Sequence, residues 1–289
     1  MRRLLLGPAV LLATLLAAPA LQVVQVVGAP SAVADELPVL TQVTAPSVDG
    51  TRRYGHTLVA DPGRWSPTPA ATAYQWFRGS KAITGATGRR HVIRPGDVGH
   101  QLAVRVRVNR PGYATTTVLT RTAVIRHRVD ARRTVRYEVR VKGQVSSSLV
   151  RQFRQQAQET YADARGWRAR GVVFVPVRSG GAFTLWISQA RYLPRFSSVC
   201  STQWSCRVGR NVVINVERWK HASPAWNRAG GSLRNYRHMV VNHETGHWLG
   251  FGHAGCSRRG APAPVMMQQS KGLDGCRFNP WPTLSELRR

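Results

Sequence analysis

One short stretch near the C-terminus constrains this chain more than any other feature. The residues from His243 onward read H-E-x-x-H-x-x-G-x-x-H, so that His243 and His247 are four positions apart. On an α-helix, residues at this spacing lie on one face, and the two imidazoles therefore point to the same side. Gly250 can end the helix in a left-handed turn, and the chain can then return and bring His253 to the same point. The pattern predicts a helix followed at once by a tight bend.

These residue types at this spacing predict a metal site. Imidazole nitrogens bind Zn²⁺ at about 2.0–2.1 Å, and three protein ligands leave a coordination position open, which is typical of a catalytic site. Glu244 projects about 100° round the helix from His243, where it can reach a metal-bound water more easily than the ion. We therefore predict that His243, His247 and His253 bind Zn²⁺ and that Glu244 is the catalytic base.

The stretch resembles the signature of the metzincin metallopeptidases, which carry a methionine in a tight turn beneath the metal. Residues Pro264–Gln269 follow His253 and contain two methionines. Met266 fits the apolar-Met-x pattern best and is our Met-turn residue, with a structural role, while Met267 is the alternative. The tyrosine that some metzincins place after this methionine is missing, so no Tyr ligand is predicted.

The resemblance implies a zinc-dependent endopeptidase. Glu244 would accept a proton as a metal-bound water attacks the scissile carbonyl, and would return it to the leaving amine. The strand expected at Asn211–Glu217 would be the sheet edge to which an extended peptide adds. Two alternatives stay open: a noncatalytic cell-surface binding protein with a zinc site, and a zinc hydrolase acting on cell-wall peptides or amidated sugars.

The region from Val135 to Trp281 also resembles a narrower group, the secreted DUF3152 domain of actinobacteria. Membership implies a zincin-like peptidase and names no substrate. The residues that carry the resemblance are Gly166-Trp167, Val241–Glu244, Gly246–Gly250, Pro264–Met266, Gly275-Cys276 and Asn279–Pro282.

The N-terminus has the features of an export signal. Arg2 and Arg3 precede an uncharged apolar run over Leu4–Val27, and Ala32–Ala34 supplies an A-x-A cleavage site. We predict a signal peptide over residues 1–34 and a secreted or cell-surface protein. The run is also long enough for an uncleaved membrane anchor, and the Arg pair permits a twin-arginine signal.

Export changes the interpretation of the four cysteines. Outside the cell they favour disulfides over thiolate metal ligands. Of the three possible pairings we favour the two local ones, Cys200–Cys206 and Cys256–Cys276, although the sequence alone does not fix the connectivity.

The formal charge is +29, from 42 basic and 13 acidic residues. A field of this sign favours contact with anionic cell-wall polymers or acidic lipid head groups, or else simply keeps the surface soluble. We expect the protein to be a monomer that acts on a peptide or protein substrate. We expect no specific nucleic-acid partner.

Two regions of the chain differ in their pattern of apolar and polar residues. Residues 35–127 alternate apolar and polar positions between Gly and Pro turns, which predicts an all-β sandwich. This part resembles bacterial immunoglobulin-like modules through the segments Gly63–Trp65, Tyr74–Trp76, Ile83–Ala86 and Asp97–Gly99. Residues 128–289 predict an α+β zincin-like domain. Its expected elements are strands at Thr134–Val141, Gly171–Val177, Phe183–Ser188 and Asn211–Glu217, and helices at Ser146–Arg165 and Leu233–Leu249.

Overall fold

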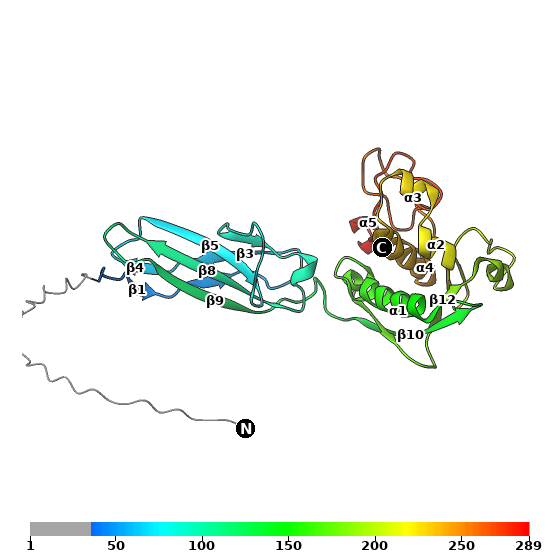
Figure 1. The fold of residues 1–289 in the computed structure, drawn as a ribbon, viewed down its shortest axis with the longest axis horizontal. Coiled ribbons are helices and arrows are strands. Elements are labelled where there is room, and N and C mark those ends of the chain that lie inside the picture. The colour runs from blue at the N-terminus through cyan, green and yellow to red at the C-terminus, as the bar shows by residue number, and fades with distance from the viewer. Residues whose placement is uncertain (1–35, 289) are drawn as a thin grey trace, which may run out of the picture. The chain divides into compact units, whose positions relative to one another are not determined.

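The computed structural model describes residues 36–288, which form a mixed α/β structure with several sheets (Figure 1). The predicted signal peptide lies outside the described residues. The two largest hydrophobic cores of the described residues are built from separate stretches of chain: the buried residues of one span Leu40–Ile125 and those of the other Val135–Met266. The division at residue 127 stays a prediction. Within residues 36–288, no helix is both long enough and apolar enough to cross a membrane.

The first stretch contains only strands and one short 3-10 helix, as the alternating pattern predicted. Its strands pair antiparallel in three sheets whose side chains share one core, in which Trp76 is fully buried. The immunoglobulin-like character of this part stays a resemblance. The sheets are β1–β4, β2–β3–β7 and β6–β5–β8–β9, formed by β1 (Thr41–Thr44), β2 (Ser47–Asp49), β3 (Thr57–Asp61), β4 (Arg64–Ser66), β5 (Ala71–Arg78), β6 (Lys81–Ala82), β7 (Arg90–Val92), β8 (Gln101–Asn109) and β9 (Thr116–Val124).

Asp97 is a charged residue inside this β structure, at the corner that the sequence marks by Asp-x-Gly. Its carboxylate is fully buried and accepts hydrogen bonds from the Arg78 guanidinium at 2.8 and 2.9 Å. It also lies 2.9 Å from His91 Nε2 and accepts the Arg94 backbone N–H at 2.8 Å. Burial alone would raise the pKa of Asp97, but these bonds outweigh it and lower the pKa to about 2. The buried charge is therefore stabilised by its partners.

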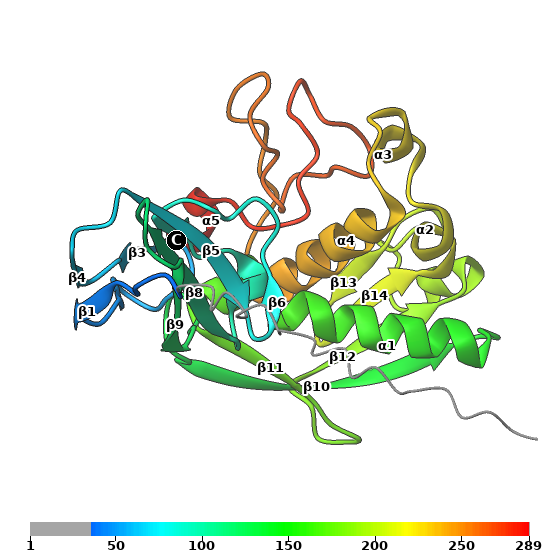
Figure 2. The same cartoon turned by 60° about the vertical axis from the view of Figure 1, so that its left-hand side comes forward.

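A five-stranded sheet with the order β11–β10–β12–β14–β13 organises the second stretch. The first four strands run parallel, and only β13 runs antiparallel, against β14. Figure 2 shows α1 and α4 together on one side of this sheet. The strands are β10 (Arg133–Lys142), β11 (Val172–Pro176), β12 (Phe183–Ser188), β13 (Cys206–Val208) and β14 (Asn211–Asn215), and the helices are α1 (Ser147–Ala162), α2 (Val216–His221), α3 (Pro224–Arg228), α4 (Leu233–Trp248) and α5 (Leu284–Arg288). The 3-10 helices among residues 36–288 are η1 (Pro95–Asp97), η2 (Trp167–Arg170) and η3 (Ala190–Arg195).

Helix α1 forms where the apolar spacing predicted it. The Ser146 hydroxyl accepts the Leu149 N–H and caps the helix, which removes one of the unpaired donors of its first turn. Phe153, Ala157 and Tyr161 recur at i+4 and are buried. Each large apolar side chain buried in this way contributes roughly 1.5–3 kcal/mol. The packing of α1 thus supports the layer that carries α4.

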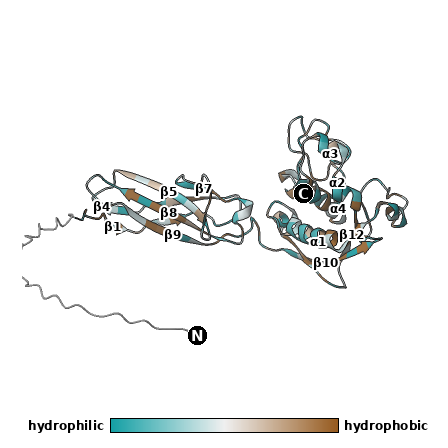
Figure 3. Cartoon of the chain, in the orientation of Figure 1, coloured by the Kyte–Doolittle hydropathy of each residue, from teal (hydrophilic) through white to brown (hydrophobic). Residues whose placement is uncertain are grey.

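Hydrophobic and hydrophilic residues alternate along several strands, as the colouring in Figure 3 shows. In β10, Val135 and Tyr137 are buried, whereas Arg136 and Arg140 are exposed. The predicted strand with one solvated face is confirmed.

One expectation about the sheet is wrong. The stretch Asn211–Glu217 was expected to be a single edge strand, but β14 ends at Asn215 and β13 covers its outer side. The Asn215 side chain accepts the Glu217 N–H and starts α2, which ends the strand early. The edge of the sheet is therefore β13, a strand too short for its pattern to be recognised.

Candidate metal centre

Helix α4 places two of the three histidines. It begins at Leu233, where the Ser232 hydroxyl accepts the Asn235 N–H, and it ends at Trp248. His243 and His247 lie one turn apart in its last part. Gly250 then adopts a φ of +98°, a conformation that few residues other than glycine take up, and turns the chain out of the helix. The predicted helix and bend are confirmed.

The three histidines meet after this bend. His247 Nε2 lies 3.1 Å from His243 Nε2 and 3.1 Å from His253 Nε2. One nitrogen from each ring belongs to a group able to hold a metal ion. Three nitrogens at about 2.05 Å from a tetrahedral ion are about 3.3 Å apart, close to the separations seen here. The geometry of the ring nitrogens thus fits a single ion.

The hydrogen bonds of the rings support the same conclusion. His243 Nδ1 lies 2.8 Å from the Val265 carbonyl oxygen, and His247 Nδ1 lies 2.8 Å from that of Phe251. Because a carbonyl only accepts, both Nδ1 atoms carry the proton and both Nε2 atoms present a lone pair. Two lone pairs 3.1 Å apart cannot bond to each other, but both can bind one cation. Carbonyl partners of this kind orient metal-binding histidines and raise their basicity.

The surroundings keep these rings neutral, which is the form that binds metals. Burial, together with the neighbouring His247, lowers the pKa of His243 to about 3, although its bond to the Val265 carbonyl opposes this. Burial also lowers the pKa of His247 and of His253. The lowered pKa values favour the neutral, metal-binding form of all three rings.

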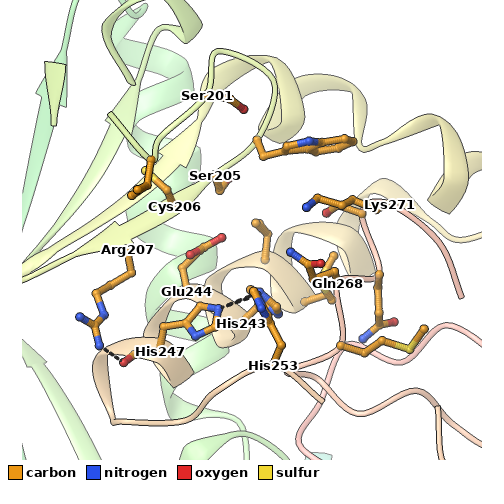
Figure 4. A pocket seen from close by; sticks show the side chains of 17 residues that line it. Ser201, Ser205, Cys206, Arg207, His243, Glu244, His247, His253, Gln268 and Lys271 are labelled. Atoms are coloured by element: carbon orange, nitrogen blue, oxygen red, sulfur yellow. Dashed lines mark hydrogen bonds between the residues drawn. The ribbon is translucent and has the colours of Figure 1, made fainter. Parts of the chain in front are cut away.

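Glu244 lies on the same helix turn and is 5% exposed, so its carboxyl group is almost removed from water. This burial raises the pKa of Glu244 to about 8, while the positive charge of Arg207 lowers it in part. Figure 4 shows Glu244, His243 and His253 at one pocket. The predicted base and the predicted ligands therefore border the same space.

The pocket has a volume of about 370 Å³. One wall comes from Trp204 and Ser205, which lead into β13, and from Arg207 of β13 itself, and another from residues 268–271 after the methionines. Arg207 donates a hydrogen bond to the carbonyl of His247 and so ties β13 to the end of α4. Arg207 was not singled out from the sequence, because its role depends on a strand that the sequence did not reveal.

The structure separates the two methionines. Met266 is buried in the main core, where its sulfur lies against Gly246 of α4. Met267 is buried in a separate, smaller hydrophobic cluster and borders the pocket. The assignment of Met266 as the Met-turn residue, with Met267 as the alternative, stays a prediction. Glu286 of α5 bonds to this turn and was missed, since nothing in its local sequence marks it.

Both favoured disulfides are present, Cys200–Cys206 and Cys256–Cys276. The first closes a small loop that forms part of the pocket wall, and the second fastens the segment after His253. Two disulfides are compatible with an extracellular protein.

Fold and site together define a mixed α/β protein whose three clustered histidines can hold a metal ion. A comparison with protein families matches residues 115–283, more than half of the chain, to the family described as "Protein of unknown function (DUF3152)". The chain belongs to the DUF3152 family. A search of curated proteins found no match.

Proposed function

We propose that this chain is an exported zinc-dependent peptidase of the metzincin type. The observation that carries the proposal is the buried Glu244 carboxyl group at the same pocket as three converging histidine nitrogens. A purely structural zinc site has no use for an acid at this position.

The residues that would hold the zinc ion are His243, His247 and His253. Bound zinc would supply Lewis-acid polarisation of the substrate carbonyl and would activate water near neutral pH. The protein prepares the ligands in advance, because the carbonyls of Val265 and Phe251 fix two of the rings with their lone pairs facing inward.

Glu244 has the properties of a proton carrier. Burial favours its neutral form, whereas Arg207 and a bound dication favour the carboxylate. A carboxyl group balanced in this way can take a proton from attacking water and return it to the leaving amine. Its seclusion also keeps bulk water from competing for that proton.

The substrate would be an extended peptide. Strand β13 pairs with β14 on one side, and no other described strand lies on its outer side. An unpaired edge offers backbone N–H and C=O groups to a peptide that adds as a further strand. Because Cys206 and Arg207 belong to β13 and also border the pocket, such a peptide would lie beside the histidines.

Cleavage of a peptide library by the zinc-loaded protein tests the proposal. We expect the wild type to cut and Glu244→Gln to lose at least a hundredfold in rate while keeping its zinc, because general base catalysis contributes about 10²–10⁴. Glu217→Gln is the matched control, since its exposed carboxylate makes only ion pairs of 3.9 Å with the described residues.

Three outcomes separate the alternatives. A wild type that binds zinc but cuts no peptide contradicts the peptidase and leaves the noncatalytic binding protein or a hydrolase of amidated sugars. Cleavage confined to cell-wall peptides favours the wall hydrolase. Loss of zinc from Glu244→Gln would make this residue a ligand rather than a base.

A further inference from the structure

We propose that Glu286, in the last helix of the chain, is a positioning residue that holds the metal ligands His243 and His253 in place. The inference rests on the metal site of the proposed function. It assigns a task to a buried charge that the reaction itself does not use.

The Glu286 carboxylate is 3% exposed and accepts bonds from two consecutive backbone groups. Its Oε1 accepts the Met266 N–H at 2.8 Å, and its Oε2 accepts the Val265 N–H at 3.0 Å. Thr283 donates its backbone N–H and its hydroxyl to Oε2 at 2.7 and 2.8 Å. Each carboxylate oxygen thus faces donors only, and bonds of this charged kind are about twice as strong as neutral ones.

The carbonyls of the same two residues bond one of the metal ligands and the residue that follows another. The Val265 carbonyl accepts the His243 Nδ1–H at 2.8 Å. The Met266 carbonyl accepts the Ala254 N–H at 3.1 Å, directly after His253. Glu286 therefore fixes the peptide group between Val265 and Met266, whose carbonyl orients His243. Its hold on the Met266 N–H also positions the Met266 backbone, whose own carbonyl bonds the chain next to His253.

A neutral amide cannot replace this carboxylate. In Glu286→Gln, one side of the amide is an NH₂ group that faces backbone N–H donors, so at least one buried donor loses its acceptor. The Val265–Met266 segment must then shift, and its carbonyls move with it. Loss of a residue that supports a metal ligand typically costs 10–100-fold in metal affinity.

Zinc affinity of the full chain, measured by competition with a chelator, tests the proposal. We expect E286Q to bind zinc at least tenfold more weakly than the wild type, with Glu217→Gln as the control that stays unchanged. Circular dichroism establishes that each variant is folded. A residue that only stabilises the fold would lower the melting temperature of the metal-free protein and leave zinc affinity as it was.

Folded E286Q with zinc affinity within twofold of the wild type would overturn the proposal. If E286Q does not fold, E286D decides: it keeps the charge but withdraws it by one methylene, so we expect weaker zinc binding, and unchanged binding overturns the proposal. A wild type that binds no zinc refutes the proposed function itself, which is a different result from equal binding by wild type and variant.

Discussion

Gly246 lies in α4 between Glu244 and His247, and its lack of a side chain leaves room for two buried neighbours. A Cβ atom at this position would collide with the Met266 sulfur and would lie 2.8 Å from Trp167 Cζ2. Neither neighbour can withdraw easily, because both are 1% exposed and the Trp167 indole donates a 2.9 Å hydrogen bond to the Asn242 carbonyl. The Gly246→Ala variant therefore forces the backbone or the core to move.

The magnitude follows from two opposing effects. Adding a methyl group to a filled core costs about 1–3 kcal/mol, and the rigid neighbours place this site towards the upper end. Replacing glycine by alanine inside a helix returns about 0.5–1 kcal/mol. We expect a net loss of about 2 kcal/mol in the free energy of unfolding, or about 4–8 °C in melting temperature for a region of this size.

Differential scanning calorimetry measures this loss directly. The relevant transition is the one that zinc shifts upward in the wild type, because it reports the region that contains α4. Gly252→Ala is the matched control, since a Cβ there meets nothing within 4 Å. A Gly246→Ala protein that melts at or above the wild-type temperature would refute the packing of Met266 and Trp167 against Gly246 that we describe.

Three further predictions concern stability. The pKa of Asp97 is about 2 in the folded protein, compared with 3.8 for an unperturbed Asp side chain. The ionised carboxylate therefore contributes fully to the free energy of unfolding above about pH 4, and this contribution is lost as the pH falls towards 2. Urea titrations of the wild type should show that about 2 kcal/mol of stability depends on pH in this range. The Asp97→Asn variant should lack this dependence, whereas the control variant Asp49→Asn, at an exposed position, should keep it. Burial lowers the pKa of His238 from 6.5 to about 4 in the folded protein. As the pH is lowered from 6.5 to 4, this histidine takes up a proton in the unfolded chain but not in the folded one, and the free energy of unfolding therefore falls. His238→Gln should remove up to about 3 kcal/mol of that pH dependence, and an unchanged slope would contradict it. Finally, Cys256 and Cys276 close a loop with a separation of 20 residues. Replacing both by Ser should cost about 3 kcal/mol in urea denaturation, whereas a loss below about 1 kcal/mol would show that the loop is ordered without the bond.

Local patterns predicted the parts of the fold that depend on local physics. Strand β12 begins and ends where its apolar run does, and α1 follows its i+4 stripe from the Ser146 cap. The clustering of the three histidines was predictable for the same reason, because helix geometry places His243 beside His247 and the turn at Gly250 allows His253 to return to them.

Features that depend on distant contacts were not predictable. Strand β13 has three residues and exists only because β14 pairs with it. The role of Glu286 depends on bonds to residues 20 and 21 positions away in the sequence. Arg207 acts through the carbonyl of His247, 40 positions further on, and no local periodicity encodes such a contact.

The central claim is that three histidines hold one metal ion beside Glu244. Native mass spectrometry of the purified chain, with elemental analysis, measures this most directly. We predict one zinc per chain, loss of that zinc in His247→Ala, and its retention in Glu244→Gln. A chain that binds no metal, or a His247→Ala variant that keeps its zinc with unchanged affinity, would contradict the account.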